Sequence, residues 1–168
     1  MDELFASGKE KKGVNVVFIG GVAIALAIVA GAIWMLSSKP SIEQQTAKIL
    51  EGTFRDGSPE FTALTKDILI STDDETVESP MGLGTISMFI KGRIYNKGAK
   101  MITTLEVNVG VVTEKNEVLR EKKILVVPIQ QPVLNAGDTI PITLTLDGFD
   151  RKDDRANIRW KVTAIRAE

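Results

Sequence analysis

The side chains that come nearest to chemistry in this sequence are two groups of carboxylates. Residues 147–154 hold four aspartates, and residues 73–78 hold two aspartates and two glutamates. Carboxylate oxygens bind calcium, and two carboxylates that face each other can hydrolyse glycosides. The first group does not have the spacing of a calcium-binding loop, and Arg151, Lys152 and Arg155 lie within or beside it. We therefore expect the first group to form a solvated loop that neutralises its own charge, and the second group to form a solvated connection.

Residue types that commonly carry catalysis or cofactors are missing from the sequence. There is no histidine and no cysteine, which removes the usual triad base, the thiolate nucleophile, disulfides and the usual haem ligands. The 21 basic and 22 acidic side chains nearly balance, and aromatic residues make up only 5%, so nucleic-acid binding is not indicated either. We therefore expect a protein that is not an enzyme, with no cofactor, no metal and no evident small-molecule substrate.

A further candidate motif is the glycine-bearing apolar stretch at residues 81–84, Met-Gly-Leu-Gly. It has too few glycines ahead of a helix to cradle a phosphate or a dinucleotide. Two interpretations stay open: an ordinary loop that leads into a strand, or a segment that contacts a partner protein. In the second case Met81 and Leu83 are the contact residues.

The first structural element that the sequence predicts is an uncharged run over residues 14–36. Asn15 is its single polar side chain. As a helix this run would extend roughly 34 Å, more than the bilayer's hydrocarbon core of about 30 Å. A buried helix of a water-soluble protein would show a polar face, and this run shows none. The other alternative is a cleavable signal peptide, with basic residues at 9–12 and a small-residue site at 30–32. The run is longer than such peptides have and continues past that site, so we expect a retained transmembrane helix.

The flanks of this helix favour one orientation in the membrane. Three lysines precede the run, against two soon after it, which favours a cytoplasmic N-terminal segment at residues 1–13. The C-terminal domain would then be extracytoplasmic, in the periplasm if the membrane is a bacterial inner membrane. Trp34 suits the membrane interface, because its ring can lie among the headgroups while its N–H stays wet.

Small residues recur along one side of the same helix. Such residues let a second helix approach closely, since lipid gives no hydrophobic drive between helices. The alternative is that alanine and glycine are simply frequent in membrane spans. On the first interpretation the packing residues are Gly20, Gly21, Ala23, Ala27 and Gly31.

The remaining sequence predicts a stalk followed by a β domain. Residues 37–65 are typical of a juxtamembrane stalk with a short helix, in which Ser41 and Gln44 have the spacing of a capping box. Over residues 66–168, apolar and polar residues alternate with a period of two between turn residues. About six or seven such strands predict an Ig-like antiparallel β-sandwich with Trp160 as its central aromatic. The expected fold class is mainly β, with a single N-terminal transmembrane α-helix and a short helical stalk before the sandwich.

Two turn motifs give the expected sandwich a family resemblance. Residues 92–98, Gly-Arg-Ile-Tyr-Asn-Lys-Gly, resemble the "G-x-hydrophobic-x-N-x-G" opening of FxLYD-type domains, and residues 134–138, Leu-Asn-Ala-Gly-Asp, resemble their "L-x-x-G-[DE]" turn. Asn96 and Gly98 also suit a tight hairpin that needs positive φ. The resemblance covers residues 86–166 and implies a small Ig-like sandwich outside the membrane, behind one anchor helix, without catalytic residues.

Two functions are compatible with these expectations. The first is a non-catalytic accessory or scaffold subunit of a multi-subunit membrane complex, such as a photosynthetic or respiratory assembly, which packs on other subunits through its helix and its sandwich. The second is a membrane-tethered envelope module that binds a peptide, lipid or glycan. A plain tether needs no small-residue face, so substitutions on that face distinguish the two.

Overall fold

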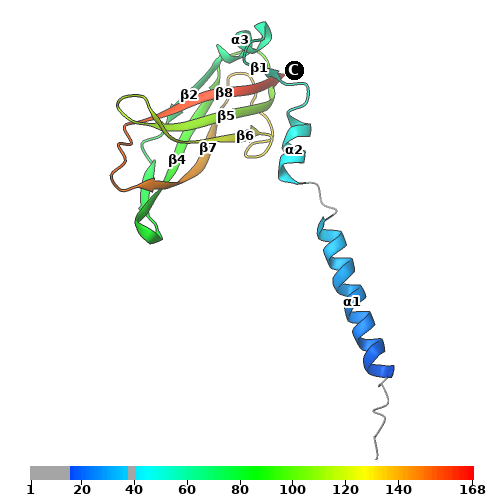
Figure 1. Cartoon of the computed structure of the whole chain (residues 1–168). Coiled ribbons are helices and arrows are strands. Elements are labelled where there is room, and N and C mark those ends of the chain that lie inside the picture. Colours follow the sequence, from blue (N-terminus) through cyan, green and yellow to red (C-terminus); the bar gives the residue numbers. More distant parts are fainter. Residues whose placement is uncertain (1–15, 38–40) are drawn as a thin grey trace, which may run out of the picture. The chain divides into compact units, whose positions relative to one another are not determined.

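The structure is a computed structural model that describes residues 16–37 and 41–168 (Figure 1). The expected cytoplasmic segment, residues 1–13, lies outside the described residues, as do the first two residues of the uncharged run. The chain divides into two compact units, Met1–Gln45 and Thr46–Glu168.

The first unit is helical in its described part. Helix α1 spans Val16–Ser37, and α2, Ile42–Ile49, begins in this unit. The predicted capping box is confirmed: the Gln44 N–H donates to Ser41 Oγ and the Ser41 N–H donates to Gln44 Oε1, each over 3.2 Å. These bonds satisfy donors that the start of a helix otherwise leaves unpaired. Among the described residues, no helix combines the length and the apolarity required of a membrane span.

The second unit is built from two antiparallel sheets (Figure 1). The first sheet has the strand order β1 (Phe54–Arg55), β8 (Asn157–Ala167), β5 (Ile102–Val112) and β6 (Val118–Val127). In the second sheet β4 (Thr85–Asn96) is central; β7 (Thr139–Asp150) pairs with one edge, and β2 (Ile68–Thr72) and β3 (Val77–Pro80) pair in succession with the other. Helix α3 (Pro59–Thr65) precedes β2, and the 3₁₀ turn η1 (Gly82–Gly84) precedes β4. The described chain is thus mainly β, with the layers of a β-sandwich.

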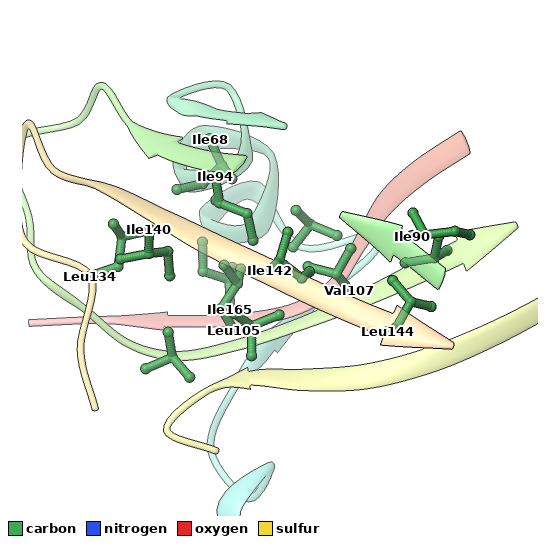
Figure 2. Close-up of a cluster of buried hydrophobic side chains, with 14 of the residues drawn as sticks. Ile68, Ile90, Ile94, Leu105, Val107, Leu134, Ile140, Ile142, Leu144 and Ile165 are labelled. Atoms are coloured by element: carbon green, nitrogen blue, oxygen red, sulfur yellow. The ribbon is translucent and has the colours of Figure 1, made fainter. Parts of the chain in front are cut away.

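The core lies between the two sheets and is largely aliphatic (Figure 2). Ile90 and Ile94 of β4, Ile142 of β7, and Leu105 and Val107 of β5 belong to one cluster and have no exposed surface. Each such side chain contributes about 1.5–3 kcal/mol relative to leaving it in water.

The predicted alternation is confirmed in β4 and β7, but in β5 Thr104 and Glu106, expected on the polar face, are also buried. In β8 Val162 and Ile165 belong to the core, whereas Ala164, expected on the inward face, packs in a separate cluster.

The most deeply buried aromatic of this core is Phe149, whereas the sequence had suggested Trp160. Phe149 is fully buried, and Trp160 is half-buried. The indole N–H of Trp160 donates to Thr72 Oγ1 over 2.8 Å, a bond that the aliphatic interior could not supply. The sequence did not indicate Phe149 because the residues around it are typical of a polar loop, but strand β7 continues through it to Asp150.

Part of the segment expected to be a stalk lies in the second unit. Strand β1 pairs with β8, with Phe54 opposite Ile165. Leu50, directly after α2, packs with Leu125 and Ala164 in a second, smaller apolar cluster. The second unit therefore begins before the expected boundary at residue 66, because the sheet buries apolar side chains of that segment.

Candidate functional site

The residues predicted to pack against a second helix lie in α1. A Cβ built on Gly20, Gly21 or Gly31 would meet nothing within 4 Å outside the neighbouring helix backbone, and Ala23 and Ala27 are exposed. The helical period puts Ala23, Ala27 and Gly31 on one side of α1. That side is therefore free to receive another helix as far as the described chain is concerned.

The rest of α1 is also apolar and exposed. Trp34 is 74% exposed, and Ile24, Leu26 and Ile28 are each more than 60% exposed. Every side chain of residues 19–35 is exposed, and none of them is charged. A soluble surface helix normally carries a polar face, so a helix like α1 needs an apolar environment on every side.

The two predicted partner-contact residues lie between β3 and β4. Met81 is 47% exposed, and its N–H donates to Thr85 O over 2.9 Å, which closes a turn. Leu83 falls in η1, and its side chain lies outside the described residues. Gly84 has a φ of 82°, a conformation that glycine adopts without strain. This segment is a tight turn that leaves Met81 on the surface.

Three of the four acidic residues at 73–78 are paired with basic side chains, among them Glu75 with Lys91. Asp73 lies 2.8 Å from Arg93 Nη2, and Glu78 lies 2.9 Å from Arg155 Nε. The backbone N–H of Glu75, and after it Arg93, hold the pKa of Asp73 below its usual value. The hydrogen bonds that Arg155 donates to the Glu78 carboxylate raise the pKa of Arg155. Basic side chains thus neutralise these carboxylates, which the sequence had led us to expect only of the group at 147–154.

In the group at 147–154, Asp150 and Asp153 hold a turn together, whereas Asp147 accepts from Ser87 Oγ and Asp154 accepts the Glu114 N–H. The Asp150 N–H donates to Asp153 Oδ2 over 2.7 Å, and the Lys152 N–H donates to Asp150 Oδ1 over 3.0 Å. Within the described part of the chain, no group of acidic side chains is arranged to hold a metal ion.

A cavity of about 420 Å³ in the second unit was not anticipated from the sequence. It lies where α3, β1, the hairpin between β4 and β5, and the end of β8 meet. Phe54, Leu64, Ile102 and Ala167 give it an apolar wall. Small-molecule sites typically enclose about 300–1,000 Å³, so the volume is sufficient for a compact organic molecule.

The cap of α3 fixes one side of this cavity. Ser58 Oγ accepts the Phe61 N–H over 3.1 Å, and Pro59 occupies the first helical position, where its missing N–H costs nothing. Phe61 is buried in the core and holds the helix against the sheets. Leu64, one turn later, is left to line the cavity.

Asn96 supports the opposite side and is 1% exposed. Its Nδ2 donates to the carbonyls of Lys100, Asn135 and Leu134 over 2.8, 3.1 and 3.3 Å, and its Oδ1 accepts the Gly98 N–H over 3.0 Å. These bonds tie the β4–β5 hairpin to the loop before β7. Neither Asn96 nor Gly98 has the positive φ that the sequence suggested; the motif acts through the amide side chain.

Three charged side chains also line the cavity: Glu60, Asp67 and Lys100. Asp67 is half-buried, and the other two are exposed. None of the three takes part in an ion pair within the described residues. A Cβ on Gly98 would lie 3.2 Å from Asp67 Cβ and 3.3 Å from its Oδ2, so the glycine makes room for this carboxylate. The cavity thus offers unpaired carboxylates beside an apolar wall.

Comparison with known proteins adds little to this description. No protein-family model and no curated protein matches the chain. Solved structures with some similarity include that of a Bordetella pertussis protein provisionally assigned as ApaA, 21% identical over 48% of this chain and 67% of its own, with a TM-score of 0.36. Another is the structural-genomics target SoR45, 10% identical over 62% of this chain and 86% of its own, with a TM-score of 0.40. At TM-scores this low neither likeness carries an argument about fold or function.

Proposed function

We propose that this protein is a non-catalytic accessory or scaffold subunit of a multi-subunit membrane complex, with photosynthetic and respiratory assemblies as the natural candidates. Helix α1 anchors it in the bilayer with the N-terminus in the cytoplasm, and the sandwich braces the complex on the periplasmic side. The observation that carries the proposal is that α1 exposes uncharged, apolar side chains all round and small residues along one side.

Lipid is the environment that an all-round apolar helix requires. The uncharged run of the sequence, residues 14–36, is long enough as a helix to cross the hydrocarbon core. Ile19, Val22 and Leu26 border an apolar hollow of about 300 Å³ at Ala23. A side chain of a neighbouring helix would fill such a hollow, and close packing is what holds helices together in lipid.

The sandwich is suited to bracing. We assign it to the Ig-like domains of the FxLYD type, and the two antiparallel sheets and the Asn96 hairpin support this assignment. Paired charges such as Asp73 with Arg93 leave it without a strong surface field of one sign. Met81, on the turn before β4, is a contact residue for a neighbouring subunit.

The experiment that tests the proposal is co-migration on a native gel. Membranes holding the full chain are solubilised in a mild detergent, and mass spectrometry identifies what migrates with it. A large complex at fixed stoichiometry is the expected result. Migration of the chain alone, or only with a second copy, would refute the scaffold proposal.

A pair of matched variants makes this experiment specific for the small-residue side. Ala23→Leu with Ala27→Leu fills the side that these residues share with Gly20 and Gly31, whereas Ala25→Leu with Ala32→Leu adds the same two leucines on the opposite side, where Gly21 lies. Both variants are equally apolar and should insert equally well. We expect the first to leave the complex and the second to stay in it; equal retention of both would exclude packing through this face.

A second candidate function is that of a membrane-tethered envelope module, which the sequence analysis expected to bind a peptide, lipid or glycan. The cavity beside Asp67 is the observation that favours it. The two functions are compatible, because the cavity lies in the second unit and the proposed helix contact lies in α1.

A further inference from the structure

We infer that the cavity between α3, β1 and the β4–β5 hairpin is a binding site for a small organic cation, a compact apolar molecule that carries one ammonium group. This inference replaces the peptide, lipid or glycan of the second candidate function by a small organic cation, and it does not depend on the scaffold proposal. The two fail separately, since one is read from complex membership and the other from ligand binding.

Size and lining define the apolar part of the ligand. The cavity holds about 420 Å³, and its wall is formed by Phe54, Leu64, Ile102 and Ala167. Of these, Ile102 is 2% exposed and belongs to the sandwich core, so that part of the wall is rigid. A short branched alkyl chain or a single ring would replace water against this wall, which is the favourable term in binding to such sites.

Charge defines the polar part. Asp67 and Glu60 each contribute a carboxylate, and neither has an ion pair within the described residues. Elsewhere on the sandwich the carboxylates of Asp56, Asp73 and Glu78 are paired with basic side chains. An ammonium group would give Asp67 a charge-assisted hydrogen bond, which is stronger than a neutral one.

Lys100 supplies an internal check on this assignment. It lines the same cavity, is exposed, and carries the charge of the proposed ligand. Its carbonyl accepts the bond from Asn96, so a change of its side chain leaves the hairpin intact. Removal of this positive charge should therefore strengthen cation binding, whereas removal of the Asp67 charge should weaken it.

The test is photoaffinity labelling of the full chain in lipid nanodiscs. The probe is a branched alkylammonium that carries a diazirine, and matched probes replace the ammonium by an alcohol or a carboxylate. Peptide mapping locates the label, and competition with isopentylammonium gives the half-maximal concentration. We expect the ammonium probe to label residues 54–67 and 96–102, and the two matched probes to label them weakly.

The variants then test the carboxylates. Asp67→Asn should raise the half-maximal concentration about tenfold or more, as expected for a lost hydrogen bond to a charged group. Lys100→Met should lower it about twofold to fivefold, the range for an exposed charge pair. Circular dichroism melting checks that each variant folds, and Glu60→Gln, on the exposed side of α3, serves if Asp67→Asn does not. Equal labelling by the alcohol probe, label confined to α1, or an unchanged half-maximal concentration in the carboxylate variants would overturn the inference.

Discussion

The side-chain amide of Gln130 makes the two backbone hydrogen bonds that a neighbouring strand would make with Thr143 of β7. The Thr143 N–H donates to Gln130 Oε1 over 3.1 Å, and Gln130 Nε2 donates to Thr143 O over 2.8 Å. Gln130 lies in the loop after β6. It therefore links β6, at the edge of the first sheet, to β7, at the edge of the second, although the two strands share no backbone ladder.

Two side chains of β6 act on the same edge. Arg120 Nη2 donates to Gly148 O over 2.7 Å, and Lys122 Nζ donates to Thr145 O over 3.4 Å. An open strand edge invites pairing with other chains, and charged side chains laid across it prevent this. Side chains thus close the sandwich along β6 and β7.

We expect Gln130→Leu to weaken this closure. Loss of both amide hydrogen bonds should lower the free energy of unfolding by about 1–2 kcal/mol, because each contributes about 1 kcal/mol net. The freed edge of β7 should also increase self-association. Urea unfolding followed by circular dichroism measures the first effect and light scattering the second. Gln131→Leu is the matched control; if it behaves like Gln130→Leu, the closure has no special role.

Gly92 of β4 lies where no side chain would fit. A Cβ there would lie 2.7 Å from Ser71 O and 2.9 Å from Trp160 Cζ2. Because one of these atoms is backbone, the strands themselves would have to shift. We expect Gly92→Ala to lower the free energy of unfolding by about 1–3 kcal/mol, the usual cost of overpacking.

Gly110, in the middle of β5, provides the comparison for Gly92. A Cβ there would meet nothing nearer than 3.8 Å. Gly110→Ala should therefore be neutral or stabilise by about 0.4–1 kcal/mol, since alanine restricts the unfolded chain. Urea unfolding of the two variants side by side decides the matter. Equal destabilisation would mean that loss of glycine, and not the contact with Trp160, is what matters.

The predictions from sequence succeeded where residues close together in the chain determine the local structure. Period-two alternation identified the strands because each inward side chain, such as Ile90 or Ile142, is buried by its own sheet position. The capping box at Ser41 and Gln44 was predictable for the same reason, since both partners lie within one turn. Phe149 was not predicted because polar residues flank it on both sides. Only the structure shows that β7 extends to Asp150 and that Phe149 lies on its inward face.

The cavity could not be predicted in the same way. Its lining comes from separate segments that approach one another only after both sheets have formed, and its charged residues stand apart in the sequence. Asn96 was the one usable signal. The sequence indicates Asn96 as a turn residue. Its bonds to Leu134 and Asn135 could not be predicted, because these residues lie 38 and 39 positions away in the chain.

Acid sensitivity should depend in part on Asp73. The backbone N–H of Glu75 and the charge of Arg93 hold its folded pKa below the ordinary value of 3.8. A carboxyl whose pKa is lower in the folded state stabilises the fold above the ordinary pKa, and this contribution is lost as the pH falls through the folded value. We therefore expect Asp73→Asn to show a shallower loss of stability below about pH 4 than the parent chain.

The relative size of the two influences that lower the pKa of Asp73 allows a second test. Because the Glu75 N–H is the larger influence, Arg93→Gln should flatten the acid limb less than Asp73→Asn does. Thermal melting across a pH series from neutral to strongly acidic gives both slopes. An acid limb that Asp73→Asn leaves unchanged would show that the contacts of this carboxylate are too solvated to matter.

The membrane orientation that we propose can be tested because the chain has no cysteine. Any cysteine introduced is the only one present, so labelling reports a single position. With the N-terminus inside, Lys115→Cys, in the exposed turn between β5 and β6, should react in intact cells with a maleimide that does not cross the inner membrane. Ser7→Cys, ahead of the uncharged run, should react only after the cells are lysed. The reverse pattern would invert the orientation, and equal reaction of both sites in intact cells would refute an anchor that spans the bilayer.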